Sequence, residues 1–111
     1  VVDLVAGEAE RLYAAPPAWS AIQKLGEQLA MKGREAAFEL VSEELFGLLA
    51  RDAQDRQAAG HAGEAAALAA FWSSEQARWR EGLAYNLDRK QLLVTFFHGL
   101  AQVRERDDRA A

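Results

Sequence analysis

The stretch that decides the fold runs Tyr85-Asn86-Leu87-Asp88-Arg89-Lys90-Gln91-Leu92-Leu93 and continues Val94-Thr95-Phe96-Phe97-His98-Gly99-Leu100. Asp88 is a good helix N-cap, and Gln91, three residues later, completes a capping box. Leu87 and Leu92 occupy the two positions of a hydrophobic staple. The apolar residues then recur at helical spacing on one broad face: Leu92, Leu93, Phe96, Phe97, Leu100 and Val103. The stretch therefore predicts a core helix with a strong start.

The rest of the chain predicts four more helices, at 3–14, 18–32, 34–57 and 64–83, with a loop at 58–63. Pro16-Pro17 ends the first of these, because the residue before a proline is pushed out of the helical region. A close approach of two helices would explain Gly47 inside the third helix, and so would chance. Ser73-Ser74 weaken the middle of the fourth, where the helix could bend or split. We expect an all-α, compact bundle of about five helices, with residues 1–111 forming one domain.

Composition narrows the functional classes. The chain has 111 residues, no cysteine, and a net charge of -4 from 17 acidic and 13 basic residues. Disulfides and thiolate metal sites are excluded, and the acidic balance argues against a free-standing nucleic-acid binder. No apolar run approaches the roughly 20 residues that span a membrane. The chain starts at Val1 without a methionine or a signal pattern, so we expect a fragment of a longer protein; a processed terminus is the alternative.

Motifs that carry chemistry are missing. Neither a P-loop nor a G-x-G-x-x-G motif occurs, so no nucleotide or other cofactor is expected. His61 and His98 lack the partners of a metal site and are interpreted as surface or helix-flank residues. Glu39 shares a helix face with Glu35 and with Glu43, but a di-iron site needs E-x-x-H pairs on other helices, so a solvated acidic stripe is expected. We predict no catalytic and no metal-binding residue, and hence no enzyme.

Two tryptophans are candidate contact residues. Trp72 and Trp79 qualify because tryptophan is enriched at interface hot spots, and in a small bundle one of them could stay partly exposed.

The basic group at the junction of the last two predicted helices has two interpretations. Arg78, Arg80, Arg89 and Lys90 lie close to aromatic residues there. Such a group could stack single-stranded nucleic acid, or it could form salt bridges with Glu75, Glu81 and Asp88. The second interpretation is favoured.

The segment from Asn86 to Leu93, N-L-D-R-K-Q-L-L, followed by an apolar helix and a charged tail, resembles the C-terminal collar domain of the delta-prime family of bacterial DNA polymerase III clamp-loader subunits. The order of the remaining segments is similar. Leu12-Tyr13 precede a proline turn, Leu25 to Gly33 form a helix end, and a helix bearing tryptophans leads to the final motif. The resemblance covers nearly the whole chain, and it is sharpest from Asn86 to Leu93.

This resemblance implies a scaffold function. In the family, collar domains follow an AAA+ module and pack side by side in a ring of five subunits, which holds the cytoplasmic clamp loader together. The implied partners are the delta subunit and the ATPase gamma/tau subunits, with no direct contact to nucleic acid, membrane or metal. A ring position needs two different surfaces, so apolar area should remain exposed. The resemblance therefore adds Tyr85 to Trp72 and Trp79 as a candidate contact, with Arg89 and Lys90 as candidate rim contacts. The alternative is a stand-alone helical adaptor or regulator that binds a partner protein or forms a homodimer.

Overall fold

Five helices occur among residues 2–110, as the sequence predicts. The computed structural model describes residues 2–110, and side chains from 5 to 106. The helices are α1 (Val2–Ala14), α2 (Trp19–Ala30), α3 (Glu35–Ala58), α4 (Ala62–Ala84) and α5 (Arg89–Ala110). No strand occurs among residues 2–110. The prediction of an all-α bundle is confirmed.

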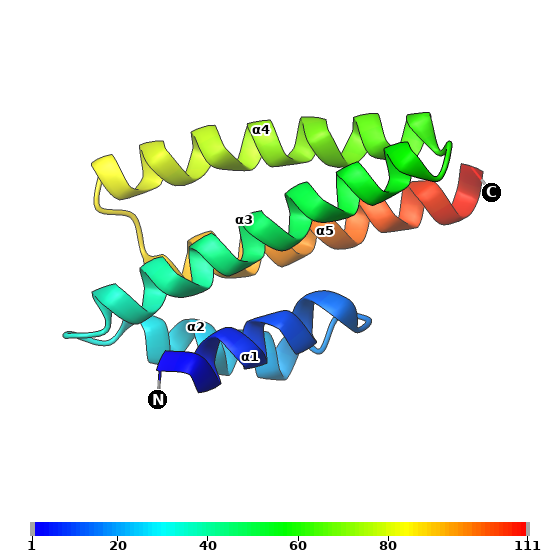
Figure 1. The fold of residues 1–111 in the computed structure, drawn as a ribbon. Coiled ribbons are helices and arrows are strands. Elements are labelled where there is room, and N and C mark those ends of the chain that lie inside the picture. Colours follow the sequence, from blue (N-terminus) through cyan, green and yellow to red (C-terminus); the bar gives the residue numbers. More distant parts are fainter. Residues whose placement is uncertain (1, 111) are drawn as a thin grey trace.

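The two central helices are α3 and α5 (Figure 1). On one side α4 packs against both of them, and on the other side α2 does the same, with α1 against α3. The α2–α3 turn and the α4–α5 turn both lie at the left end of the bundle in Figure 1. Segments that are more than 50 residues apart in the sequence therefore meet at this end, and the candidate site lies there.

One hydrophobic core joins the five helices. Its largest fully buried side chains come from α2, α3, α4 and α5 and include Ile22, Leu25, Val41, Leu49 and Phe96. The face predicted for the last helix is the buried one: Leu92, Leu93, Phe96, Phe97, Leu100 and Val103 are all buried. The helical period of these residues therefore identified the correct face.

The α3–α4 turn and the α4–α5 turn both have the geometry of a Schellman helix end, in which a left-handed residue follows the helix. After α3, Gly60 has φ 84°, and the His61 and Gly60 N–H groups donate to the carbonyls of Arg56 and Gln57. Since this turn is complete at His61, α4 begins at Ala62, two residues earlier than expected. The helix then runs to Ala84 without a break at Ser73-Ser74.

Close helix contacts occur at other glycines than the one considered from the sequence. A Cβ placed on Gly47 would meet nothing within 4 Å. On Gly26 of α2, by contrast, a Cβ would lie 2.9 Å from Cγ and 3.3 Å from Cα of Lys90 on α5. On Gly82 it would lie 2.7 Å from the Leu92 side chain. The glycines that matter for packing are therefore those where α2 and α4 meet α5.

Candidate functional site

The turn between α4 and α5 is built from the Asn86-Leu87-Asp88 motif. Asn86 has φ 60°, a left-handed conformation that asparagine tolerates better than most residues. The Leu87 N–H donates to the Gly82 carbonyl at 2.8 Å, and the Asn86 N–H donates to the Leu83 carbonyl at 3.3 Å. These are the two hydrogen bonds of a Schellman motif with asparagine in the place of glycine. Asn86 therefore ends α4.

The next residue starts α5. The Asp88 carboxylate accepts a hydrogen bond from the Lys90 N–H at 3.1 Å, and the Asp88 carbonyl accepts the first helical bond, from Leu92. Gln91 is exposed and, within the described part of the chain, makes no return bond to the Asp88 N–H. The cap is therefore one-sided. Leu87 and the buried Leu92 both lie within contact distance of the position that a Gly82 Cβ would take, so the staple closes over that glycine.

Arg89 and Lys90 fasten the start of α5 to α2. The Arg89 Nη2 group donates to the carbonyls of Ala30 and Met31 at 3.1 and 3.2 Å, where α2 ends. A cation there satisfies free carbonyls and opposes the negative end of the helix dipole. The Lys90 Nζ pairs with Glu27 of α2 at 3.1 Å. Both cations expected to act at the rim of an interface are thus engaged within the chain.

Trp79 lies inside the bundle rather than on its surface. Its side chain is 5 % exposed, and its ring stacks on Phe38 with centroids 5.5 Å apart. The Trp79 indole N–H donates to Ser42 Oγ at 3.1 Å, and that hydroxyl donates to the Phe38 carbonyl at 2.8 Å. Of the two candidate tryptophans, Trp79 is therefore the buried one, because α3 supplies both an aromatic partner and an acceptor for the indole N–H. Trp72 is half-buried against the core.

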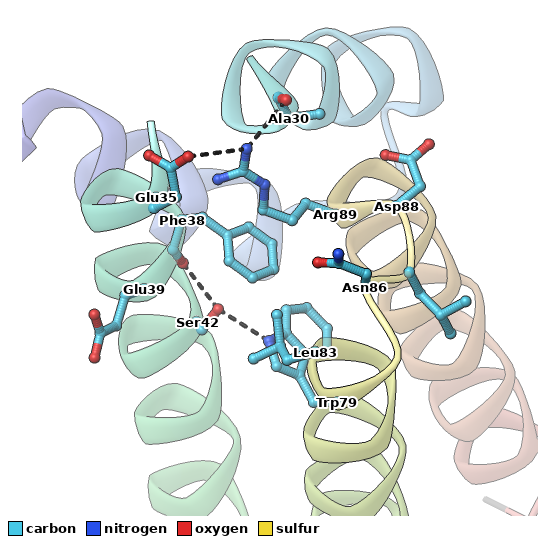
Figure 2. Close-up of a pocket in the computed structure, with 11 residues that line it drawn as sticks. Ala30, Glu35, Phe38, Glu39, Ser42, Trp79, Leu83, Asn86, Asp88 and Arg89 are labelled. Carbon is cyan, nitrogen blue, oxygen red and sulfur yellow. Dashed lines mark hydrogen bonds and ion pairs between the residues drawn. The ribbon is translucent and has the colours of Figure 1, made fainter. Parts of the chain in front are cut away.

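A groove, which we call the junction groove, opens above this pair between the ends of α3 and α4 (Figure 2). Its volume is about 530 Å³. Phe38 and Trp79 form its floor, and Leu83 and Leu87 lie at its wall. Arg89 lies over Phe38, with its guanidinium carbon 5.9 Å from the ring centroid, and its Nη1 atom is buried without a hydrogen-bond partner. The groove therefore joins apolar rings and leucine side chains to a lining that also carries Arg89 and the carboxylates of Glu35, Glu39 and Asp88.

Apolar side chains are exposed around this groove. Among the described residues, the exposed large hydrophobic side chains are Met31, Leu83, Tyr85 and Leu87, each between 50 % and 73 % exposed. We call these four the end patch. All belong to the α2–α3 or α4–α5 turn region, at the same end of the bundle (Figure 1). Of the residues predicted as contacts, Tyr85 is the one that stands free at this surface.

The basic group predicted near this turn is partly neutralised within the chain. Arg78 forms two hydrogen bonds with the buried carboxylate of Glu75, at 2.9 and 2.6 Å, and a third with the Leu92 carbonyl of α5. Glu75 is 6 % exposed, so the pair ties α4 to α5 from a partly buried position. These contacts match the salt-bridge interpretation of Arg78. Sequence spacing could find the ion pair at i and i+3, but not the Leu92 carbonyl.

The remaining polar clusters serve the packing of the helices. His98 stacks on Trp19 at 4.3 Å between ring centroids, and His61 ends the α3–α4 turn. Across the described residues, no group of three or more metal-ligating side chains comes together. No helix in the described part of the chain is long and apolar enough to cross a membrane.

A second hollow lies between the α1–α2 turn, α3 and α5. The Tyr13 hydroxyl donates to Asp52 at 2.9 Å there, and the Arg104 guanidinium carbon lies 4.7 Å from the Tyr13 ring centroid. Burial, reinforced by Asp52, raises the pKa of the Tyr13 hydroxyl well above its ordinary value. The tyrosine therefore keeps its proton and acts as a hydrogen-bond donor between α1 and α3.

Comparison with known proteins adds no relative: no family model, no curated protein and no solved structure matches the chain. The resemblance to the clamp-loader collar therefore rests on the sequence pattern from Asn86 to Leu93 and on the order of the segments before it.

Proposed function

We propose that this chain is a scaffold domain that packs against neighbouring protein subunits, as the collar domain of a cytoplasmic clamp-loader subunit does, and that it performs no chemistry itself. The end patch is the observation that supports this proposal most strongly. Among the side chains of residues 5–106, four large apolar ones stay exposed at one end of the bundle, and the other large apolar side chains there are buried or half-buried. Clustered apolar exposure of this kind marks interaction surfaces.

The position of the Asn86-to-Leu93 segment supports the proposal as well. The Asn86-to-Leu93 segment shapes the turn that carries Leu83, Tyr85 and Leu87, so the segment that resembles the collar family is also the one that presents the patch. In this proposal the motif acts indirectly. It fixes the α4–α5 turn and the clasp to α2, and the neighbouring exposed side chains make the contact.

The test is complex formation with the implied partners. The chain is mixed with the delta and ATPase gamma/tau subunits of the same organism, and mass is measured by size exclusion with light scattering. We expect a heteromeric peak that Tyr85→Ser together with Met31→Ser weakens. Gln54→Ser, on the exposed surface of α3, is the control that leaves the peak unchanged.

The alternative, a stand-alone adaptor, gives a different result in the same measurement. If the chain does not bind the loader subunits and forms a homodimer instead, the collar proposal is refuted. If the homodimer were also lost on Tyr85→Ser, the end patch would remain an interaction surface, but for a second copy of the chain.

A further inference from the structure

We infer that the junction groove receives a basic amphipathic helix of a neighbouring protein chain, whose apolar side chains enter the groove while its cations face α3. This inference deepens the proposed function, because it names the chemistry of the partner at the end patch. It is carried by the shape of the groove and by the distribution of charge around it.

The groove offers an apolar seat that is already formed. Its floor is a stacked pair of rings, Phe38 and Trp79, which the Ser42 hydrogen bonds hold in place. Leu83 and Leu87 stand half-exposed beside it, so an entering side chain would cover them. Helices recognise such seats by placing apolar residues at i, i+3 or i+4, and i+7 into a groove. The volume of about 530 Å³ has room for anchors of this kind.

The charge beside the groove is negative. Glu35, Glu39 and Glu43 follow each other at i, i+4 and i+8 on α3, and all three are exposed. They form one stripe about 12 Å long on a helix face. Glu35 and Glu39 also line the groove. Hydrogen bonds from its own N–H and that of Gly33 hold the pKa of Glu35 below its usual range, so this carboxylate is charged at neutral pH.

The nearby cation pairs with one end of this stripe only. Arg89 is turned inward to the carbonyls of Ala30 and Met31, with 18 % of its side chain exposed, and it reaches Glu35 only at 3.9 Å. Glu39 and Glu43 have no ion-pair partner among the described residues. A partner with lysine or arginine at i and i+4 would match their spacing, which is about 6 Å along the helix.

The same charges argue against the other occupants of an apolar groove. Nucleic acid phosphates would be repelled by the carboxylates of α3. A symmetric dimer through this face would bring the stripe of one copy to that of the other, because a two-fold interface joins the same patch on both subunits. A basic helix of a different chain satisfies both the apolar seat and the charge.

The test uses two synthetic peptides of about 18 residues, long enough to form a helix. Both carry leucine at i, i+4 and i+7, and they differ only in the flanking residues, which are lysine in one and glutamate in the other. Fluorescence anisotropy of the labelled peptides against the whole chain should show the basic peptide binding about tenfold tighter or more at low salt. High salt should reduce this preference.

Two variants connect the binding to the groove. Glu39→Lys should weaken the basic peptide about fivefold, since it turns an exposed attraction into a repulsion. Glu10→Lys, the same change at an exposed site on α1, is the matched control and should have no effect. Leu83→Ser should weaken the basic peptide by a similar factor. Both altered side chains are exposed, so circular dichroism should show that the variants remain folded.

The outcomes separate this inference from the proposed function. Equal binding of the two peptides, no binding of the basic one, or binding that Glu39→Lys and Leu83→Ser leave unchanged would overturn the inference. A loader complex that forms and tolerates both variants would keep the scaffold proposal and refute only the basic-helix partner. Selective binding of the basic peptide without a loader complex would refute the collar proposal and keep the groove.

Discussion

Asn86 gives the sharpest test of how the α4–α5 turn is made. Its φ of 60° places it in the left-handed region, where an ordinary L-residue costs about 1–2 kcal/mol relative to glycine. The left-handed conformation is less unfavourable for asparagine than for alanine. We therefore expect Asn86→Ala to lower the free energy of unfolding by about 1 kcal/mol. Asn86→Gly should stay within about 0.5 kcal/mol of the parent, because glycine accepts the angle but gains freedom in the unfolded chain.

These free energies convert to a measurable melting shift. An unfolding entropy of about 2.1 cal/mol/K per residue gives about 230 cal/mol/K for the 111 residues, so 1 kcal/mol corresponds to about 4 °C. Circular dichroism at 222 nm during heating, and urea unfolding at a fixed temperature, give two independent values.

The matched pair makes the reasoning refutable. Both substitutions remove the same amide side chain, which is exposed and makes no side-chain hydrogen bond among the described residues. They differ in the Cβ that alanine brings into the left-handed region. If the alanine and glycine variants of Asn86 unfold at the same temperature, the backbone angle is not what the asparagine provides. The Schellman interpretation of the turn would then be wrong.

Three further predictions follow from the packing. Gly47→Ala should raise the free energy of unfolding by about 0.5–1 kcal/mol, because its Cβ meets nothing. Gly26→Ala should lower the same free energy by about 1–3 kcal/mol, because the new methyl group presses on α5. Urea unfolding of the two variants tests this pair, and equal shifts would contradict it. Arg78→Ala should lower the free energy of unfolding by about 2–3 kcal/mol, because it leaves the buried Glu75 carboxylate unpaired. If urea unfolding shows a decrease below about 1 kcal/mol, this carboxylate is hydrated in the folded variant. Because the pKa of Tyr13 is raised in the folded chain, its hydroxyl ionises in the unfolded chain first, as pH rises past about 10. The free energy of unfolding that Tyr13 contributes is therefore complete below that pH and should fall above it. Tyr13→Phe should flatten this part of the urea stability profile, and an unchanged slope would disprove the assignment.

The helices were predictable because each is encoded locally. The apolar period of the last helix and the Asp88 start signal are contained in one short stretch, and the start of α5 at Arg89 agrees with them. The boundary error at α4 has a local cause too. The pattern Ala58 to Gly63 has two glycines, and only the backbone geometry shows that Gly60 takes the left-handed position while Gly63 is helical.

The candidate site was less predictable because its contacts are distant in sequence. Trp79 is buried by Phe38, which lies 41 residues earlier, and no periodicity within one helix indicates such a pairing. Arg89 is 58 residues from the Met31 carbonyl that it contacts. A basic residue at the first helical position looks like a surface group until the end of another helix is placed beside it. The sequence therefore indicated Tyr85, which is exposed, but it could not decide which of Trp72 and Trp79 is buried.

The structure separates two roles that the sequence motif combines. Asn86, Asp88 and Arg89 are used within the chain, so a partner at this end must contact the side chains that they leave exposed, such as Leu83 and Tyr85. Stability arithmetic makes this testable. A domain with about 5 kcal/mol of stability that loses 1 kcal/mol keeps a folded-to-unfolded ratio near 10³, so its affinity for a partner hardly changes. Asn86→Ala should therefore mainly lower the melting temperature, while Leu83→Ser and Tyr85→Ser should mainly weaken binding.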